Sequence, residues 1–457
     1  MSVKLFVPPK RFFTKPVVSI NVQRICEPLN CVVGLLERQR PGVVLAVIAV
    51  VLAGIATAKA QSSSNQVESA ALPASPAPDN SDFDDKLTDG WWGERQRLEQ
   101  KGISLNAQLV LEGFGNAQGG VDPGFVGAST IDLNLSLDTE KAFDWKGGKF
   151  YVDLEDHAGR DPSQDLTGDL QIFDKLNSPP YLQIFELWYE QKLFDDQLRI
   201  KLGKVDANTE FAVIDNGLTF LNASTQVSPT ITPFPTTPDP MPGANVFFTP
   251  GKVWYASFGA FYANRSDTFG DFTGHPQSIQ PTEYGTLFIG ETGVRWQQAP
   301  LWDAGGNLKV GVWGHNGTFT RLDGSPQNGS GGYYGIFNQT LWQPAGETEQ
   351  GRNLGAFVEG GQTQSSVSVI NWNLAGGLAW TGPFAARPAD ILGFSANYAH
   401  LSQQAELPHS YELALESLYS VQLTKWLTLL PDFQFIIHPG GRYPRAAVGT
   451  LNLTMQF

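Results

Sequence analysis

A two-residue alternation of apolar and polar side chains constrains the fold of this chain more than any other feature. In 131–138 every odd position is Ile or Leu, and every even position is Asp, Asn or Ser. Successive side chains of a strand point to opposite faces, so this segment predicts a strand with one apolar and one polar face. The same pattern occurs in 105–112, 150–155, 185–190, 198–202 and 450–457, and weaker runs continue between 254 and 437.

The alternation alone does not distinguish a soluble β-sandwich from a membrane barrel, because both kinds of fold bury one face of each strand. Two further observations favour the barrel. The segments extend over about ten residues, the length that a tilted strand needs to cross a bilayer. Aromatic residues lie towards the ends of many segments, as an interfacial girdle requires; they are Trp188, Tyr189, Trp254, Tyr255, Trp296, Trp313, Trp342, Trp380, Tyr398 and Trp426.

Backbone donors and acceptors have no water partners in hydrocarbon, so a sheet that crosses a membrane must be closed. We therefore predict an all-β fold, a transmembrane antiparallel β-barrel of about 16 strands with a short N-terminal helix. A barrel of this size encloses an aqueous channel rather than a packed core.

The first sixty residues differ from the rest and indicate export. They carry eight basic and two acidic residues, and Arg38 and Arg40 precede the apolar run 41–58 and a small-residue site at 58–60. This order is typical of a secretory signal. An uncleaved anchor is the alternative, although the run is at the short end of the roughly 17–25 residues that a spanning helix needs.

Three regions follow from this reading. We assign 1–60 to a signal peptide with a long basic leader, 61–86 to a disordered polar linker rich in Ser, Ala, Pro and Asp, and 87–457 to the outer-membrane barrel. Within the last region, 89–102 predicts the short helix, with Asp89 as its cap and Gly102 as its end.

Composition excludes several classes of protein. The formal net charge is −14, and the body of the chain has no cluster of Lys and Arg, so we expect no nucleic-acid partner. Both cysteines, Cys26 and Cys31, lie in the leader. The body therefore has no disulfide framework, no Cys-ligated zinc and no catalytic Cys.

Signatures of enzymes are missing from the sequence. It contains no G-x-S-x-G elbow, P-loop, H-E-x-x-H or dinucleotide fingerprint after a strand, and its six histidines are far apart. We predict no catalytic residue, cofactor or metal site, and hence no enzyme. One alternative stays open, an exported β-rich carbohydrate-binding protein or glycoside hydrolase, whose carboxylates would be Asp153 and Glu155, or Glu186 and Glu190.

Four stretches of the sequence also resemble a known family. They are Gly-Trp-Trp-Gly at 90–93, Phe-Glu-Leu-Trp-Tyr-Glu-Gln at 185–191, Leu-Gly-Lys-Val-Asp-Ala-Asn at 202–208, and Pro-Asp-Phe-Gln-Phe-Ile-Ile with Pro-Gly-Gly at 431–441. Together they resemble the carbohydrate-selective outer-membrane porins of the OprB type, over roughly 90–457. The resemblance implies a sixteen-stranded barrel in the outer membrane of a Gram-negative bacterium, in contact with its lipid and often trimeric. It also implies facilitated diffusion of glucose and other small sugars.

Strand parity predicts which side chains line the channel. If the apolar face of each strand contacts lipid, eight side chains of 153–201 point into the lumen; they are Asp153, Glu155, His157, Glu186, Trp188, Glu190, Arg199 and Lys201. Carboxylates and guanidinium groups bind hydroxyls, and Trp stacks on the apolar face of a sugar ring. The alternative is a structural network that holds neighbouring strands in register.

Two segments near the channel are harder to interpret. Lys204, Asp206 and Asn208 continue the lumen face only if a bulge follows Gly203, and a capped turn is the alternative. The segment 222–245 contains six prolines, so we predict that it is not a central strand. It either folds inward and narrows the pore or covers the mouth from outside. We expect 324–333, rich in Gly and Asn, to be a surface loop.

Overall fold

The computed structural model describes residues 85–262, 271–273, 285–298, 304–344 and 351–457. The predicted signal peptide (1–60) and nearly all of the predicted linker (61–86) lie outside these described residues. Within them, no helix is long and apolar enough to cross a membrane.

Strands dominate the described chain. In order they are β1 (Ile103–Asn116), β2 (Gly124–Asp138), β3 (Gly148–Gly159), β4 (Tyr181–Leu193), β5 (Leu198–Val205), β6 (Met241–Phe248), β7 (Trp254–Tyr262), β8 (Asp271–Thr273), β9 (Thr286–Trp296), β10 (Gly306–Thr320), β11 (Pro326–Trp342), β12 (Asn353–Thr363), β13 (Ile370–Thr381), β14 (Ile391–Leu401), β15 (Tyr411–Thr424), β16 (Leu427–Ile437) and β17 (Ala446–Gln456).

Helical elements are short. Among the described residues the α-helices are α3 (Glu94–Gln100) and α4 (Thr139–Phe143). Single turns are η2 (Trp91–Gly93), η3 (Ser163–Thr167), η4 (Ala207–Thr209), η5 (Asp215–Gly217), η6 (Ala223–Thr225), η7 (Gln403–Ala405) and η8 (Pro439–Gly441). The helix expected at 89–102 is α3, and Gly102 ends it at φ +80°. Its cap is Gly93 rather than Asp89, with no side-chain cap bond.

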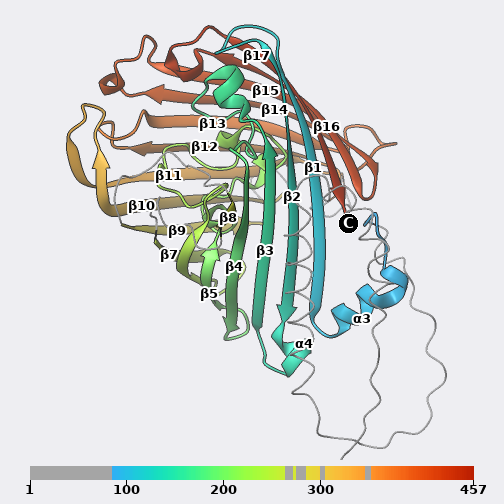
Figure 1. Cartoon of the computed structure of the whole chain (residues 1–457). Coiled ribbons are helices and arrows are strands. Elements are labelled where there is room, and N and C mark those ends of the chain that lie inside the picture. The colour runs from blue at the N-terminus through green and yellow to red at the C-terminus, as the bar shows by residue number, and fades with distance from the viewer. Residues whose placement is uncertain (1–84, 263–270, 274–284, 299–303, 345–350) are drawn as a thin grey trace, which may run out of the picture. The chain divides into compact units, whose positions relative to one another are not determined.

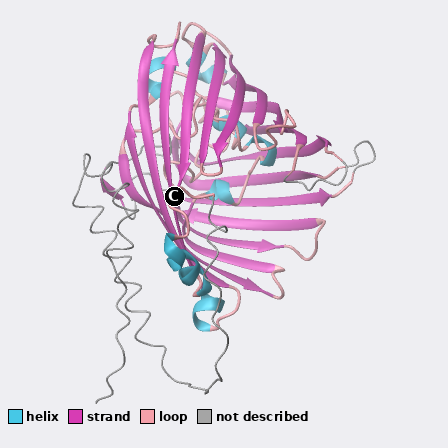
Figure 2. Ribbon diagram, turned by 90° about the vertical axis from the view of Figure 1, so that its right-hand side faces the viewer, coloured by secondary structure: helices cyan, strands magenta, loops and turns pink. Residues whose placement is uncertain are grey.

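The sheet closes on itself as a barrel (Figures 1 and 2). Each strand of the ring pairs antiparallel with the next, and β8 is outside the ring, so that β7 pairs with β9. The ring closes between β17 and β1, where Leu111 lies opposite Leu453. Sixteen strands form this ring, which confirms the predicted fold. The short β8 adds a ladder to the end of β4, beyond the residues that pair with β5. The longest connections, 160–180 and 206–240, leave the end of the barrel at which β1 ends.

The outer face of the barrel is apolar, as the alternation predicts. Large hydrophobic side chains point away from the interior and remain exposed, for example Val312 at 63%, Phe394 at 53% and Phe433 at 49%. A soluble sandwich would bury such residues, because a contiguous apolar surface of this extent is unfavourable in water. The sandwich alternative is therefore wrong. Trp188, Tyr255 and Trp313 depart from the predicted girdle, since they lie buried on the inner face.

Strand bounds agree to the residue for two of the weaker runs. The runs at 286–296 and 427–437 are β9 and β16 with the same limits. Two expectations are wrong: residues 241–245 belong to β6, and 326–333 belong to β11 rather than to a surface loop. Pro242 lies opposite Lys204 of β5, and the ladder with β7 begins one residue later, at Gly243, so the proline has a neighbouring strand on one side only.

Part of the interior of the barrel is filled by protein, unlike that of an open water-filled channel. An apolar cluster joins inner-face residues such as Phe261, Ile336 and Phe357 to Phe211 and Phe220 of the segment 206–240. Water therefore cannot occupy the whole cross-section of the barrel at this level.

Candidate functional site

The segment 206–240 folds into the barrel and is fixed to its far wall. Ala212 N donates to Glu291 Oε2 of β9 at 2.8 Å, and Asn216 Nδ2 donates to the carbonyl of Ala356 of β12 at 2.8 Å. Further along, Leu221 N donates to Glu416 Oε1 of β15 at 2.7 Å. The inward alternative for 222–240 is therefore the one that the structure adopts.

A second segment, 160–180, also turns inward. Glu412 of β15 accepts backbone N–H groups from Leu170 and Gln171 at 2.9 Å each, and Gln434 Nε2 donates to the carbonyl of Phe173 at 2.6 Å. Phe173 is fully buried and packs edge-on against Phe114 at 5.8 Å. Nothing in the composition of this segment, unlike the prolines of 222–245, distinguishes it from an external loop.

Four charged residues converge where the first inward segment leaves β5. Arg199 Nη1 lies 2.8 Å from Glu190 Oε2, and Arg199 Nη2 lies 2.6 Å from Glu210 Oε2. Lys201 also forms an ion pair with Glu210, and its Nζ lies 3.8 Å from Glu190. Burial disfavours the ionised Glu210, but its hydrogen bond with Arg199 and the nearby Lys201 outweigh this and lower the pKa of the Glu210 carboxyl.

Trp188 is packed inside this cluster. It stacks on Tyr151 at 4.8 Å, Lys201 Nζ lies 4.0 Å from the centre of its ring, and the side chain is 8% exposed. Cation–π contact and stacking both stabilise this position. For Trp188, the structural network fits the geometry better than an open platform for sugars does.

The other parity residues of β3 and β4 are also buried on the inner face. Tyr181 donates to Glu155, while His157 Nδ1 and Thr130 Oγ1 lie 2.9 Å apart. Glu186 Oε1 accepts the backbone N–H of Asp206 at 2.9 Å. Asp153 is 5% exposed and has the Tyr151 hydroxyl 3.4 Å away.

At 204–208 the structure has the capped turn, and the register of β5 with its neighbours shows no bulge after Gly203. Gly203 has φ +140°, and beyond it Lys204 turns back so that Nζ donates to Gln183 Oε1 at 3.0 Å. Asp206 then caps η4 by accepting from Asn208 N at 2.8 Å, and Asn208 Nδ2 donates to the carbonyl of Phe211 at 3.2 Å. Burial raises the pKa of Asp206 to about 6.

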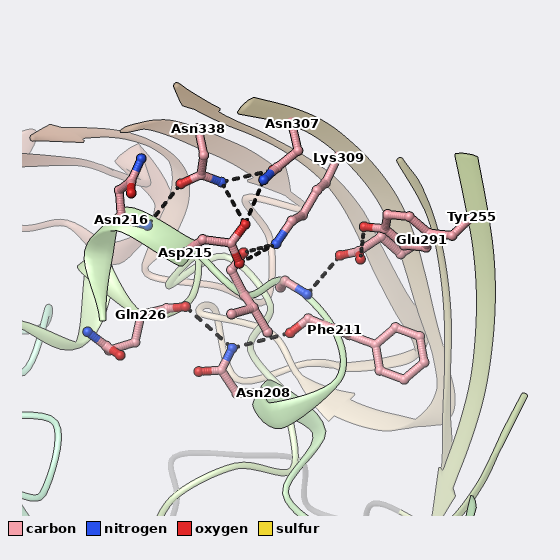
Figure 3. Close-up of polar contacts among 12 residues, drawn as sticks. Asn208, Phe211, Asp215, Asn216, Gln226, Tyr255, Glu291, Asn307, Lys309 and Asn338 are labelled. Carbon is pink, nitrogen blue, oxygen red and sulfur yellow. Dashed lines mark hydrogen bonds and ion pairs between the residues drawn. The ribbon is translucent and has the colours of Figure 1, made fainter. Parts of the chain in front are cut away.

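A further polar cluster lies where the inward segment meets β10 and β11, and it was not singled out from the sequence. Figure 3 shows Lys309 and Asn307 of β10 pointing towards Asp215, with Asn338 of β11 beside them. Lys309 Nζ lies 2.9 Å from Asp215 Oδ1, Asn307 Nδ2 donates to Asp215 Oδ2 at 2.7 Å, and Asn216 N donates to Asn338 Oδ1 at 3.1 Å. Strand alternation could have identified Asn307 and Lys309 as inward-facing, because they alternate with the apolar residues Leu308 and Val310.

A pocket of ≈ 740 Å³ adjoins this cluster. This volume is large enough for a small ligand. Its walls are mostly polar and include Asp215, Asn307, Asn338, Arg295 and Lys252. Arg295 also lies over the Tyr255 ring, 4.8 Å from its centre. Such a surface offers both hydrogen-bond donors and hydrogen-bond acceptors, which suits a neutral polyol. Among the described residues, no group of three or more His, Cys, Asp or Glu could hold a metal ion.

Comparison with known proteins gives concordant results. Residues 127–457 match the family model described as carbohydrate-selective porin, OprB family. The chain is 24% identical over 404 residues to Porin B of Pseudomonas aeruginosa, covering 77% of this chain and 86% of the relative.

Solved structures agree in fold. The high-pH structure of Pseudomonas putida OprB has a TM-score of 0.72 at 20% identity, covering 82% of this chain and 98% of that one. The low-pH structure of the same protein has a TM-score of 0.56 at 18% identity with the same coverage.

Proposed function

The chain belongs to the OprB family of carbohydrate-selective porins, and from this premise we propose how its barrel passes sugars. The protein is a sugar porin of the Gram-negative outer membrane, that is, a transport channel. One observation carries the proposed route: the segment 206–240 lies inside the barrel and is hydrogen-bonded to strands from β9 to β15. A solute that crosses the barrel must therefore pass beside this segment.

The two polar clusters lie at the start of this segment and form the walls of the route. On one side are Glu190, Arg199, Lys201 and Glu210; on the other are Asp215, Asn307, Lys309 and Asn338. In both clusters the charges are paired, so neither wall has a strong field of one sign. Hydroxyl groups can donate to the carboxylates and accept from the cations and amides, whereas an ion would have to displace an existing partner.

Recording from purified protein in planar bilayers tests the route. We expect steady conductance that falls when glucose or a short oligosaccharide is added. Asn307→Ala and Arg199→Ala should weaken this block while the heat-modifiable migration of the folded barrel is unchanged. Trp188→Ala should reduce barrel stability more than it changes the block, because Trp188 is packed. A barrel that conducts with no sugar block in the wild type contradicts the proposed route.

We infer that transport proceeds without a catalytic step. Glu155 accepts from Tyr181, Glu186 accepts the backbone N–H of Asp206, and Glu190 is paired with Arg199 and Lys201, so these three carboxylates of β3 and β4 are engaged within the protein. Incubation of the folded barrel with aryl glycosides and oligosaccharides should release no product. Hydrolysis that Glu186→Gln abolishes would support the enzyme instead.

We propose, from the family resemblance alone, that the barrel assembles as a homotrimer. Light scattering of the detergent-solubilised protein, corrected for bound detergent, gives its mass directly.

We also propose that residues 1–60 are removed on export, so that the mature chain begins at Gln61 and contains no cysteine. Intact-mass measurement of protein from outer membranes checks both the cleavage site and the absence of thiols.

A further inference from the structure

A row of rings runs along the outer face of the barrel near one end. Trp372 contacts Tyr398 at 5.1 Å, Tyr398 stacks on Tyr411 at 5.6 Å, and Tyr411 meets His438 at 4.7 Å. His438 stacks on His409 with ring centres 3.6 Å apart and planes 3° apart. Aromatic residues with a polar atom gather where hydrocarbon meets head groups, so this row marks the membrane interface.

The end of the barrel at this row faces the outside of the cell. The chain's longest connections, including 160–180 and 206–240, leave the same end. Outer-membrane barrels carry their longer loops outside and their short turns in the periplasm. The row therefore lies at the level of the outer-leaflet head groups.

A pocket of ≈ 570 Å³ adjoins the histidine end of the row, between the connections 402–410 and 438–445. Two walls are basic, with Arg442 and Arg445 beside His409 and His438, and another is formed by Phe435 and Ile437. Phe435 and Ile437 share the outward face of β16 with the exposed Phe433, since Gln434 and Ile436 between them are fully buried. The apolar wall is thus continuous with the surface that contacts lipid.

The pocket has a local excess of positive charge in an acidic protein. The connection 438–445 contains two Arg and no acidic residue, and 402–410 contains one, Glu406. Within the described part of the chain, the side chains of Arg442 and Arg445 form no ion pair or hydrogen bond, and both residues are exposed. Burial, with His409 and Arg445 close by, lowers the pKa of His438.

We propose that this pocket binds a phosphorylated lipid of the outer leaflet. Arg442 and Arg445 bind the phosphate through charge-assisted hydrogen bonds, and an acyl chain lies over Phe435 and Ile437. A soluble anion would use the guanidinium groups but would leave the apolar wall uncovered. An uncharged lipid would use the apolar wall but would leave two unpaired cations at the head-group level. The inference is independent of the sugar route, which lies inside the barrel.

Native mass spectrometry of the full-length folded barrel in detergent tests the proposal, with bisphosphorylated lipid A as the probe. We expect bound lipid on the wild type and an affinity lower by about tenfold or more for R442Q/R445Q, since each basic residue near a phosphate contributes on the order of a fivefold factor. Arg321→Gln is the matched control, because Arg321 lies in the turn after β10 at the same end of the barrel, away from the pocket.

Three outcomes would overturn the proposal. The first is equal affinity of the wild type and R442Q/R445Q, provided that both variants migrate as folded barrels. The second is equal binding of lipid A from which both phosphates have been removed. The third is displacement of the lipid by millimolar inorganic phosphate alone, which would make the pocket a site for soluble anions. Restored binding in R442K/R445K, at a reduced level, would support the charge requirement.

Discussion

At the scale of single residues, Glu210 ties the first inward segment to the barrel wall. Its carboxylate pairs with both Arg199 and Lys201, and these contacts lower its pKa despite burial. A carboxyl whose pKa is depressed in the folded state stabilises that state above its unfolded pKa of about 4.3, and loses this contribution as pH falls through the folded pKa.

We therefore expect Glu210→Gln to lower the free energy of unfolding at pH 7 by roughly 1.5–3 kcal/mol, the value of hydrogen bonds to charged groups. The difference between variant and wild type should shrink as pH falls below about 4, because the wild type then loses the same contribution. Urea unfolding in detergent micelles at pH 7 and pH 3 measures both. Glu140→Gln, at an exposed position in α4, is the control. A difference that is constant with pH would contradict the assignment.

Gly203 determines how β5 leaves the wall. It has φ +140°, and a Cβ atom there would lie 2.1 Å from the carbonyl oxygen of Leu187. We expect Gly203→Ala to destabilise the barrel by more than about 1 kcal/mol, because Ala is incompatible with both the dihedral and the contact. The urea midpoint checks this. Gly251→Ala is the control, since a Cβ there meets nothing within 4 Å, and equal effects of the two changes would contradict the role of Gly203.

At the scale of elements, the segment 206–240 should limit the flow of solute. Replacing 218–232 with a Gly-Ser linker of equal length removes Phe220 and Leu221 from the apolar cluster, and with Asn222 it removes the side-chain hydrogen bond to Gln434. We expect single-channel conductance to rise severalfold and sugar block to weaken, because the strands still pair with one another while the interior is less filled. The same replacement in the turn 321–325 should leave conductance unchanged. Unchanged conductance in the first variant would show that this segment does not limit flow.

The agreement between sequence and structure differs from element to element for physical reasons. Alternation gave the limits of β9 and β16 to the residue, although their inner faces include buried apolar residues such as Leu287 and Ile436. It did not identify the start of β6, because the prolines that indicate a loop include Pro242, the second residue of that strand. Parity placed Glu190, Arg199 and Lys201 on one wall. It could not show that Glu210 completes their network, since the path of an irregular segment has no period.

The polar cluster at β10 shows a second limit of what the sequence can predict. Asn307 and Lys309 are ordinary polar positions of a strand until Asp215, over ninety residues earlier in the chain, is brought beside them. The interior of a barrel is assembled from all its strands at once, so the residues that meet there share no local pattern. The same holds for Glu412 and Glu416, which receive backbone N–H groups from two different inward segments.

At the scale of the whole molecule, the distribution of apolar surface decides the class of fold. Exposed side chains such as Val312, Leu374 and Leu451 ring the outside, while charged residues such as Glu359 and Glu412 are fully buried inside. A soluble protein has the reverse arrangement. The barrel is therefore stable only with lipid or detergent around it, and its two ends are defined by the lengths of their connections.

This orientation can be tested directly with single cysteines, because the chain's only cysteines, Cys26 and Cys31, lie in 1–60, the part that we propose is removed on export. We expect Asp323→Cys, in the turn after β10, to react in intact cells with a maleimide carried on a polymer too large for the channel. Asp195→Cys, in the turn after β4, should react only after the outer membrane is permeabilised, since that turn lies at the opposite end. Both positions are exposed in short turns, so each serves as the other's control for reactivity. The reverse pattern would invert the barrel, and with it would move the pocket of Arg442 and Arg445 to the inner leaflet.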